Sequence, residues 1–232
     1  MPYTIVTFDV GGTLMRMDRE QVANEYVALA RARGTEIDPA AARAMFAALD
    51  DEIPERARQS PPLSLDARAG EIFWKTLFGD GWARLGLEQN AASVDTLYRQ
   101  FRLGGFNRVF DDVRPVMQAL QARGLRAGVL SNFTKDCQAI LHALGIGDYF
   151  TLFAVSAFVH AEKPDRAIFE YAVNAAKRPA GEILHVGDSP RGDVEGARAA
   201  GLAAILLDRD NWYPDYATVP RIRKLTELLE LL

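Results

Sequence analysis

In the second half of the chain, amphipathic segments alternate with short apolar runs. From position 111 onward, stretches with apolar residues at helical spacing are followed by a glycine or a tight loop and then by aliphatic residues. Short apolar runs bounded by glycine indicate buried strands, and i, i+3, i+4 spacing indicates helices. This alternation predicts a parallel sheet covered by helices on both faces. The expected strands are 125–130, 150–155, 183–186 and 202–207, and the expected helices include 136–144, 166–176, 191–200 and 222–232.

The first half has a different texture. Residues 3–8 form an apolar run that stops at Asp9 and a pair of glycines, which predicts a buried strand running into a tight turn. Between positions 18 and 108 the apolar residues have helical spacing only, and the expected helices are 19–33, 39–50, 65–78 and 91–103. We therefore expect an α/β protein with a three-layer, Rossmann-like parallel-sheet core formed by 1–14 and 109–232, and an all-helical cap domain inserted at 15–108.

Composition excludes several classes of function. The formal net charge is −4 and no block of lysine and arginine occurs, which argues against a nucleic-acid partner. Cys137 is the only cysteine, so an intrachain disulfide is impossible and the simplest expectation is a buried thiol in a reducing compartment. No apolar stretch approaches the roughly 20 residues that cross a bilayer, and the N-terminus has no secretory pattern. We expect a cytoplasmic protein with no membrane partner.

Polar residues stand where the expected strands end. The carboxyl ends of parallel strands meet at one edge of a sheet, where ligands bind, so these residues should converge. Carboxylates that meet there repel one another unless a cation lies between them, and Mg²⁺ suits hard oxygen ligands. A carboxylate beside such an ion can attack phosphorus, and an ammonium group can then stabilise the transferring oxygens. The residues concerned are Asp9, Ser131, Asn132, Lys163, Asp188 and Asp193.

These residues fall into four short motifs in a characteristic order. With them, the chain resembles the haloacid dehalogenase superfamily over essentially its whole length. A single short motif would carry little weight, but four in order, each at an expected strand end or in the following loop, are specific. The motifs are residues 9–14 (Asp-Val-Gly-Gly-Thr-Leu), residues 130–132 (Leu-Ser-Asn), Lys163-Pro164, and residues 186–189 (Val-Gly-Asp-Ser) with Asp193.

The resemblance implies a role for each matching residue. Asp9 would be the nucleophile that forms a covalent aspartyl intermediate. Thr13 and Ser131 would position the transferring group, with Asn132 beside it. Lys163 would neutralise both the nucleophile and the phosphate. These roles describe a hydrolase, most simply a phosphatase acting on a small phosphorylated metabolite.

The resemblance also implies a Mg²⁺ cofactor, and it exposes a departure from the family pattern. The ion would be held by Asp9, by the backbone carbonyl of Gly11 and by Asp188, with Asp193 in or next to its coordination shell. Phosphatases of this superfamily usually carry a second aspartate, the general acid and base, where this chain has Gly11. A carbonyl survives that substitution, but a proton shuttle does not.

Three further residues are candidates for binding substrate. The paired glycines let the backbone N–H of Gly12 approach an anion. Arg16 leaves the first motif toward the insert and can meet an anionic substrate, although a surface charge is an equal interpretation. His160 lies shortly before Lys163 and is the best available replacement for the missing base.

Other interpretations stay open at this point. Dehalogenases and phosphonate hydrolases of the superfamily also lack the second aspartate. The former need no metal, which the acidic residues around position 188 disfavour, and the latter use a cap lysine, for which Lys75 is the only candidate. Its spacing from Glu71 favours an ordinary ion pair on a helix. A weakly catalytic protein that binds a phosphorylated ligand or a protein partner is the remaining alternative.

Overall fold

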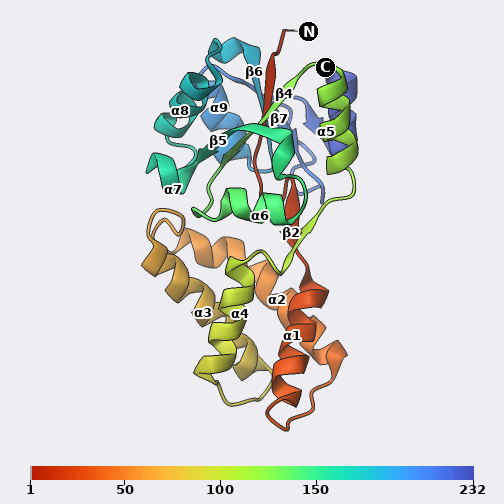
Figure 1. Cartoon of the computed structure of the whole chain (residues 1–232), viewed down its shortest axis with the longest axis vertical. Coiled ribbons are helices and arrows are strands. Elements are labelled where there is room, and N and C mark those ends of the chain that lie inside the picture. The colour runs from red at the N-terminus through yellow and green to blue at the C-terminus, as the bar shows by residue number, and fades with distance from the viewer. Residues whose placement is uncertain (1) are drawn as a thin grey trace. The chain divides into compact units, whose positions relative to one another are not determined.

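The computed structural model describes residues 2–232, which include a six-stranded parallel sheet (Figure 1). The strand order is β5-β4-β1-β6-β7-β8, and every neighbouring pair is parallel. The expected strands are all present within a residue or two of their expected ends. Their bounds are β1 (Ile5–Phe8), β4 (Arg126–Ser131), β5 (Phe150–Val155), β6 (Ile183–Gly187) and β7 (Ala203–Leu207). The sheet also contains β8 (Arg221–Ile222), which was not expected.

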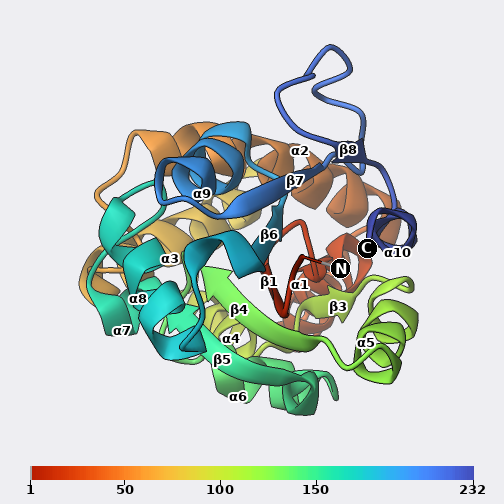
Figure 2. The same cartoon turned by 90° about the horizontal axis from the view of Figure 1, so that it is seen from above.

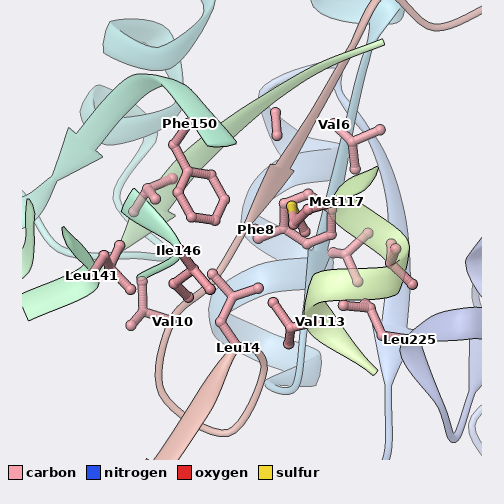
Figure 3. Close-up of a cluster of buried hydrophobic side chains, with 14 of the residues drawn as sticks. Val6, Phe8, Val10, Leu14, Val113, Met117, Leu141, Ile146, Phe150 and Leu225 are labelled. Carbon is pink, nitrogen blue, oxygen red and sulfur yellow. The ribbon is translucent and has the colours of Figure 1, made fainter. Parts of the chain in front are cut away.

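Helices cover both faces of this sheet (Figure 2). Successive strand residues point to opposite faces: Val6 and Phe8 join one apolar cluster and Ile5 joins the other. Figure 3 shows the first cluster, to which Phe8 of β1 and Met117 both belong. The helices are α5 (Val113–Ala122), α6 (Cys137–Ala143) and α10 (Leu228–Leu231) with the first cluster, α8 (Arg166–Ala176) and α9 (Gly196–Ala199) with the second, and the short α7 (Ser156–Val159) after β5. The α/β, Rossmann-like fold class is confirmed.

The chain divides into two compact units. The core unit comprises the residues up to Arg16 together with Val109–Leu232, and the insert unit is Met17–Arg108. The insert unit has its own apolar core around Tyr26 and Trp82. Its helices are α1 (Arg19–Arg31), α2 (Pro39–Arg58), α3 (Ala67–Arg84) and α4 (Ala91–Arg102), and the ribbon of β2 (Met15–Met17) and β3 (Asn107–Val109) stands where the chain leaves and re-enters the core unit.

Four expected elements were wrong in extent or type. Helix α3 was expected to end at residue 78 but runs to Arg84, and the expected helix 191–200 begins as a π-helical turn, Pro190–Glu195. Helix α2 was expected to end at residue 50, but it continues through Pro54 to Arg58; ion pairs from Arg56 to Glu52 and Asp80 hold its last turns. The expected helix 222–232 begins instead as strand β8, because the outer edge of β7 takes a partner there. Only the segments Leu225–Glu227 and Leu228–Leu231 are helical. None of the helices within residues 2–232 combines the length and apolarity needed to cross a bilayer.

Strand β1 lies at the point where the strand order reverses. The chain places β4 on one side of β1 and β6 on the other. Crevices at such a reversal, outside the carboxyl ends of the strands, are where ligands bind in open α/β sheets. The residues that follow β1, β4 and β6 therefore define the place to look for a site.

Candidate active site

The centre of the candidate site is a buried ion pair. Asp9 follows β1 directly, and its backbone N–H donates to the carbonyl oxygen of Val186 in β6. The ammonium of Lys163 lies 2.6 Å from Oδ1 of Asp9, also donates to a carboxylate oxygen of Asp193, and lies 3.1 Å from the carbonyl oxygen of Leu130. The lysine side chain is only 4% exposed. All three of its N–H bonds are thereby used, so the position of Lys163 is fixed.

Asn132 holds the loop that carries this lysine. Its side-chain Oδ1 accepts from the backbone N–H of Lys163 at 2.7 Å, and its Nδ2 donates to the Lys163 carbonyl oxygen at 3.1 Å. The next residue back, Ser131, is buried at the end of β4 and hydrogen-bonds Asp9. The amide of Asn132 is therefore used to place Lys163, while the hydroxyl of Ser131 is directed at Asp9.

A π-helical turn brings Asp193 into the site. Residues Pro190–Glu195 form this turn after β6, and the hydroxyl of Ser189 caps it by accepting from the N–H of Gly192. The second carboxylate oxygen of Asp193 accepts from the N–H of Ser189 at 2.8 Å. A Cβ on Gly187 would lie 2.1 Å from the Asp193 carboxyl carbon, so only glycine leaves room for this carboxylate.

His185 touches the site, a contact that the sequence did not reveal. It is fully buried, as expected of a core residue, but its Nε2 lies 3.0 Å from the Asp193 oxygen that Lys163 also contacts. Its Nδ1 lies 3.1 Å from the hydroxyl of Thr7 in β1. Strand alternation was the available signal, because residues two apart in a strand lie on the same face of the sheet. Thr7 therefore lies on the same face as Asp9, and His185 on the same face as Gly187.

The three carboxylates of the site differ in how readily they ionise. Burial, helped by the neighbouring carboxylate of Asp193, raises the pKa of Asp9 although Lys163 opposes the change. Burial and the repulsion of Asp9 and Asp193 raise the pKa of Asp188 well above its usual range. Burial also opposes ionisation of Asp193, but Lys163 and His185 outweigh it and lower the pKa of that carboxyl. When all three carboxylates are ionised, their combined negative charge therefore exceeds the single positive charge of Lys163.

The turn after Asp9 brings the backbone against Asp188. Gly12 has a φ of +72°, and a Cβ there would lie 2.2 Å from a carboxylate oxygen of Asp188. The hydroxyl of Thr13 is buried and has no hydrogen-bond partner among residues 2–232. A buried polar atom without a partner is costly, so this hydroxyl fits a role toward a bound group.

The residues present suit a divalent cation. Asp9, Asp188 and the Gly11 carbonyl offer hard oxygens, and Mg²⁺ is commonly held by one or two carboxylates with water and substrate oxygens. Within residues 2–232 no group of three or more His, Cys, Asp or Glu side chains is arranged to hold a metal. Asp193 does not add a third carboxylate ligand, because both of its oxygens already accept hydrogen bonds.

Gly11 stands beside open space. Its side chain would meet no heavy atom of the described core residues within 4 Å, and its φ is not positive. At this position, where the family resemblance implies a second aspartate, a Cβ therefore meets no steric obstacle.

The structure records no contact of Arg16 or His160 with these residues. Arg16 is exposed, with its guanidinium 5.4 Å from the centre of the Phe110 ring. His160 is exposed and adopts a left-handed conformation after α7. A residue that sequence reasoning missed, Arg209, donates at 2.8 Å to the carbonyl oxygen of Thr13 and pairs with Asp112. Its position just beyond β7 on the same sheet edge was the available signal.

Comparison with known proteins places this geometry in a family. The sequence model of haloacid dehalogenase-like hydrolases matches residues 3–201. A zebrafish (Danio rerio) protein, "Haloacid dehalogenase-like hydrolase domain-containing protein 3", is 28% identical over 239 residues, covering 100% of this chain and 96% of its own. A phosphoserine phosphatase of Thermus thermophilus is 32% identical over 116 residues, which is 50% of this chain and 47% of the relative.

Solved structures agree on the fold. The L-2-haloacid dehalogenase RSc1362 has a TM-score of 0.70 at 24% identity and covers 99% of this chain and 98% of its own. The HAD-hydrolase YfnB of Bacillus subtilis has a TM-score of 0.69 at 22% identity with the same coverage. Since these neighbours include a dehalogenase, the fold by itself does not choose between carbon and phosphorus as the atom attacked.

Proposed function

The chain belongs to the haloacid dehalogenase-like hydrolases, and on that premise we propose that it is a Mg²⁺-dependent phosphatase of small phosphorylated metabolites. The observation that carries the proposal is the buried contact of Lys163 with Asp9. It leaves one oxygen of the Asp9 carboxylate for attack and supplies a cation for the oxygens of the transferring phosphoryl group. Phosphatases among the sequence relatives, the phosphoserine phosphatase and a ribulose-1,5-bisphosphate 5-phosphatase, support phosphorus as the target.

The proposed metal site uses Asp9, Asp188 and the carbonyl of Gly11, with Asp193 next to it. Its support is the excess of negative charge described above and the raised pKa of Asp188. Bound there, Mg²⁺ would supply positive charge to the carboxylates and to the phosphoryl oxygens.

The reaction proposed for these residues has two steps. An oxygen of Asp9 attacks phosphorus, forming an aspartyl phosphate while the bond from phosphorus to the leaving oxygen breaks. Lys163 balances charge throughout, and the hydroxyls of Thr13 and Ser131 and the N–H of Gly12 are proposed to bind the phosphoryl oxygens. Water then attacks the phosphorus, the bond to Asp9 breaks, and inorganic phosphate leaves.

This chain lacks the residue that usually assists the proton transfers of the reaction. With Gly11 in place of the second aspartate, the leaving oxygen in the first step takes its proton from water. General acid–base assistance is worth about 10²–10⁴ in rate, so substrates with poor leaving groups suffer most. We propose a preference for aryl or acyl phosphates over alkyl phosphates, and accumulation of the aspartyl phosphate. Arg16 and His160 remain proposed substrate-binding residues, His160 as the candidate base.

Two other chemistries would use the same nucleophile. In dehalogenation Asp9 attacks carbon and displaces halide, without a metal. In phosphonate hydrolysis a lysine amine would first condense with the substrate carbonyl, releasing water and forming an imine; Asp9 would then attack phosphorus while the phosphorus–carbon bond breaks. Lys75 is poorly suited to this role because its ammonium lies 2.6 Å from Glu71 and 2.7 Å from Asp95. A weakly catalytic binding protein is the fourth interpretation, but binding alone does not require Asp9 and Lys163 to be paired.

Hydrolysis of p-nitrophenyl phosphate tests the proposal. We expect turnover with Mg²⁺, loss of turnover on adding EDTA, and none in Asp9→Asn, which keeps the size of the side chain but removes its charge. Acid-quenched enzyme should carry phosphate in the wild type only. Release of halide from a 2-haloacid in the presence of EDTA, with no phosphatase activity, would instead establish dehalogenation.

A further inference from the structure

A chain of buried polar groups extends from the candidate site into the sheet. Lys163 contacts Asp193, Asp193 contacts His185, and His185 contacts Thr7. The side chains of Lys163, Asp193 and His185 are 4%, 2% and 0% exposed. Buried polar groups of this kind are costly unless every one is satisfied, so their arrangement is specific rather than incidental.

The partners of His185 fix which ring nitrogen bears a proton. An ionised carboxylate only accepts hydrogen bonds, and the buried ammonium of Lys163, which pairs with Asp193, favours the ionised form of this carboxyl. The Nε2 atom, 3.0 Å from that carboxylate, must therefore be an N–H donor. The Nδ1 atom faces the hydroxyl of Thr7, which can donate or accept and which also lies 3.4 Å from the carbonyl oxygen of Leu184.

The two strands set this geometry. Thr7 and His185 are direct partners in the register of β1 and β6, so the sheet itself aligns the hydroxyl with the imidazole. The ring also stands edge-on to Phe169 of α8, with centroids 6.1 Å apart. The imidazole is thus held from both sides and presents one N–H to Asp193.

We propose that His185 is a positioning residue for the hydrolase reaction, acting through Asp193 on Lys163. The oxygen of Asp193 that receives the imidazole N–H is the one that contacts the ammonium. A carboxylate held in this way keeps the ammonium directed at Asp9. The role of His185 rests on the proposed function, because it matters only if Lys163 assists a reaction at Asp9. Removing a partner that orients a metal ligand typically costs about 10–100-fold in metal affinity or activity, and we expect a loss of similar size from removing the partner of Asp193.

Nuclear magnetic resonance tests the contact without any substrate. The chain has three histidines, so ¹⁵N-histidine labelling gives a readily assigned spectrum. We expect a slowly exchanging proton on Nε2 of His185 and a change in its shift in Asp193→Asn. An Nε2 without a proton, or a shift indifferent to Asp193→Asn, overturns the proposal.

Two matched amides test the consequence for catalysis. In His185→Gln the side-chain amide nitrogen reaches about as far as Nε2, whereas in His185→Asn it reaches about as far as Nδ1. With p-nitrophenyl phosphate and Mg²⁺ we expect kcat near the wild-type value for Gln, and a fall of about 10-fold or more with little change in KM for Asn. Thermal unfolding of both variants is the control for stability.

The outcomes separate the two proposals. Equal kcat values for the two variants at equal Tm overturn the role of His185. A wild type that turns over no phosphate ester contradicts the proposed function, while the resonance experiment still decides the His185–Asp193 contact. If neither variant folds, the resonance experiment on the wild type decides whether Nε2 is the donor atom.

Discussion

Restoring the missing carboxylate should restore the proton shuttle. In Gly11→Asp the new side chain enters space in which no described core atom lies within 4 Å of its Cβ, and the backbone there needs no positive φ. Surface substitutions without strain change the free energy of unfolding by at most about 0.5 kcal/mol. The folded protein should therefore tolerate the change, and any kinetic effect reports on the chemistry.

The expected size of the effect follows from what the carboxylate does. General acid–base catalysis contributes about 10²–10⁴ in rate, which is roughly 3–5.5 kcal/mol of activation free energy. Glycerol phosphate, whose leaving alkoxide is a strong base, should gain most of this factor in kcat/KM. The p-nitrophenyl ester should gain little in the first step, because its leaving group needs no proton, but the hydrolysis of the aspartyl phosphate should accelerate.

Rapid-mixing kinetics with both esters measures these steps. The wild type should release a burst of nitrophenolate before a slow steady state, and Gly11→Asp should abolish that burst. Gly11→Ala is the matched control, since it adds the same Cβ without a carboxylate and should behave like the wild type. The reasoning is refuted if the alanine and aspartate variants change the ratio of alkyl to aryl turnover equally, or if the wild type shows no burst.

Three further predictions concern neighbouring residues. Lys163→Met leaves buried carboxylates unpaired, so we expect a loss of about 3–5 kcal/mol in the free energy of unfolding as well as of activity; unchanged unfolding in denaturant would contradict the buried pair. Gly12→Ala adds a Cβ at positive φ against Asp188, and activity should fall strongly while the same change at Gly11 is tolerated; equal activities would show that the turn is not held as described. Burial raises the pKa of the Cys137 thiol from 9.0 to about 12, so it should resist thiol reagents at pH 8 until the protein unfolds. The unfolded thiol ionises first on this scale, so stability should fall by up to about 1.4 kcal/mol per pH unit between those two pKa values, and a Cys137→Ala variant should lack that part of the alkaline decline.

The positions of the strands were accessible from sequence because their physics is local. Apolar runs that end at glycine or at a carboxylate predicted where each strand would end. Because the strands are parallel, Asp9, Ser131 and Asp188 were then expected at the same edge of the sheet. That Lys163 contacts Asp9 was an expectation from the family resemblance and not from periodicity. Its loop is placed by the reciprocal hydrogen bonds of Asn132, which join segments 31 residues apart.

Other features depend on tertiary packing and left no local signal. The π-helical turn at Pro190–Glu195 was expected as an ordinary helix, and it is this turn that returns Asp193 toward Lys163. The apolar run around His185 predicted only burial; its partner Thr7 lies 178 residues away. The edge pairing of β8 replaced an expected helix because the hydrogen-bonding needs of β7 outweighed the helical spacing of the tail.

The central claim is that Asp9 receives the phosphoryl group. Acid quenching during turnover of p-nitrophenyl phosphate with Mg²⁺, followed by borohydride reduction, converts an aspartyl phosphate into homoserine, which peptide mass mapping can locate. We predict homoserine at position 9 in the wild type, more of it than in Gly11→Asp, and none in Asp9→Asn. Steady phosphate release with an unmodified Asp9, or with homoserine at another aspartate, would contradict the account.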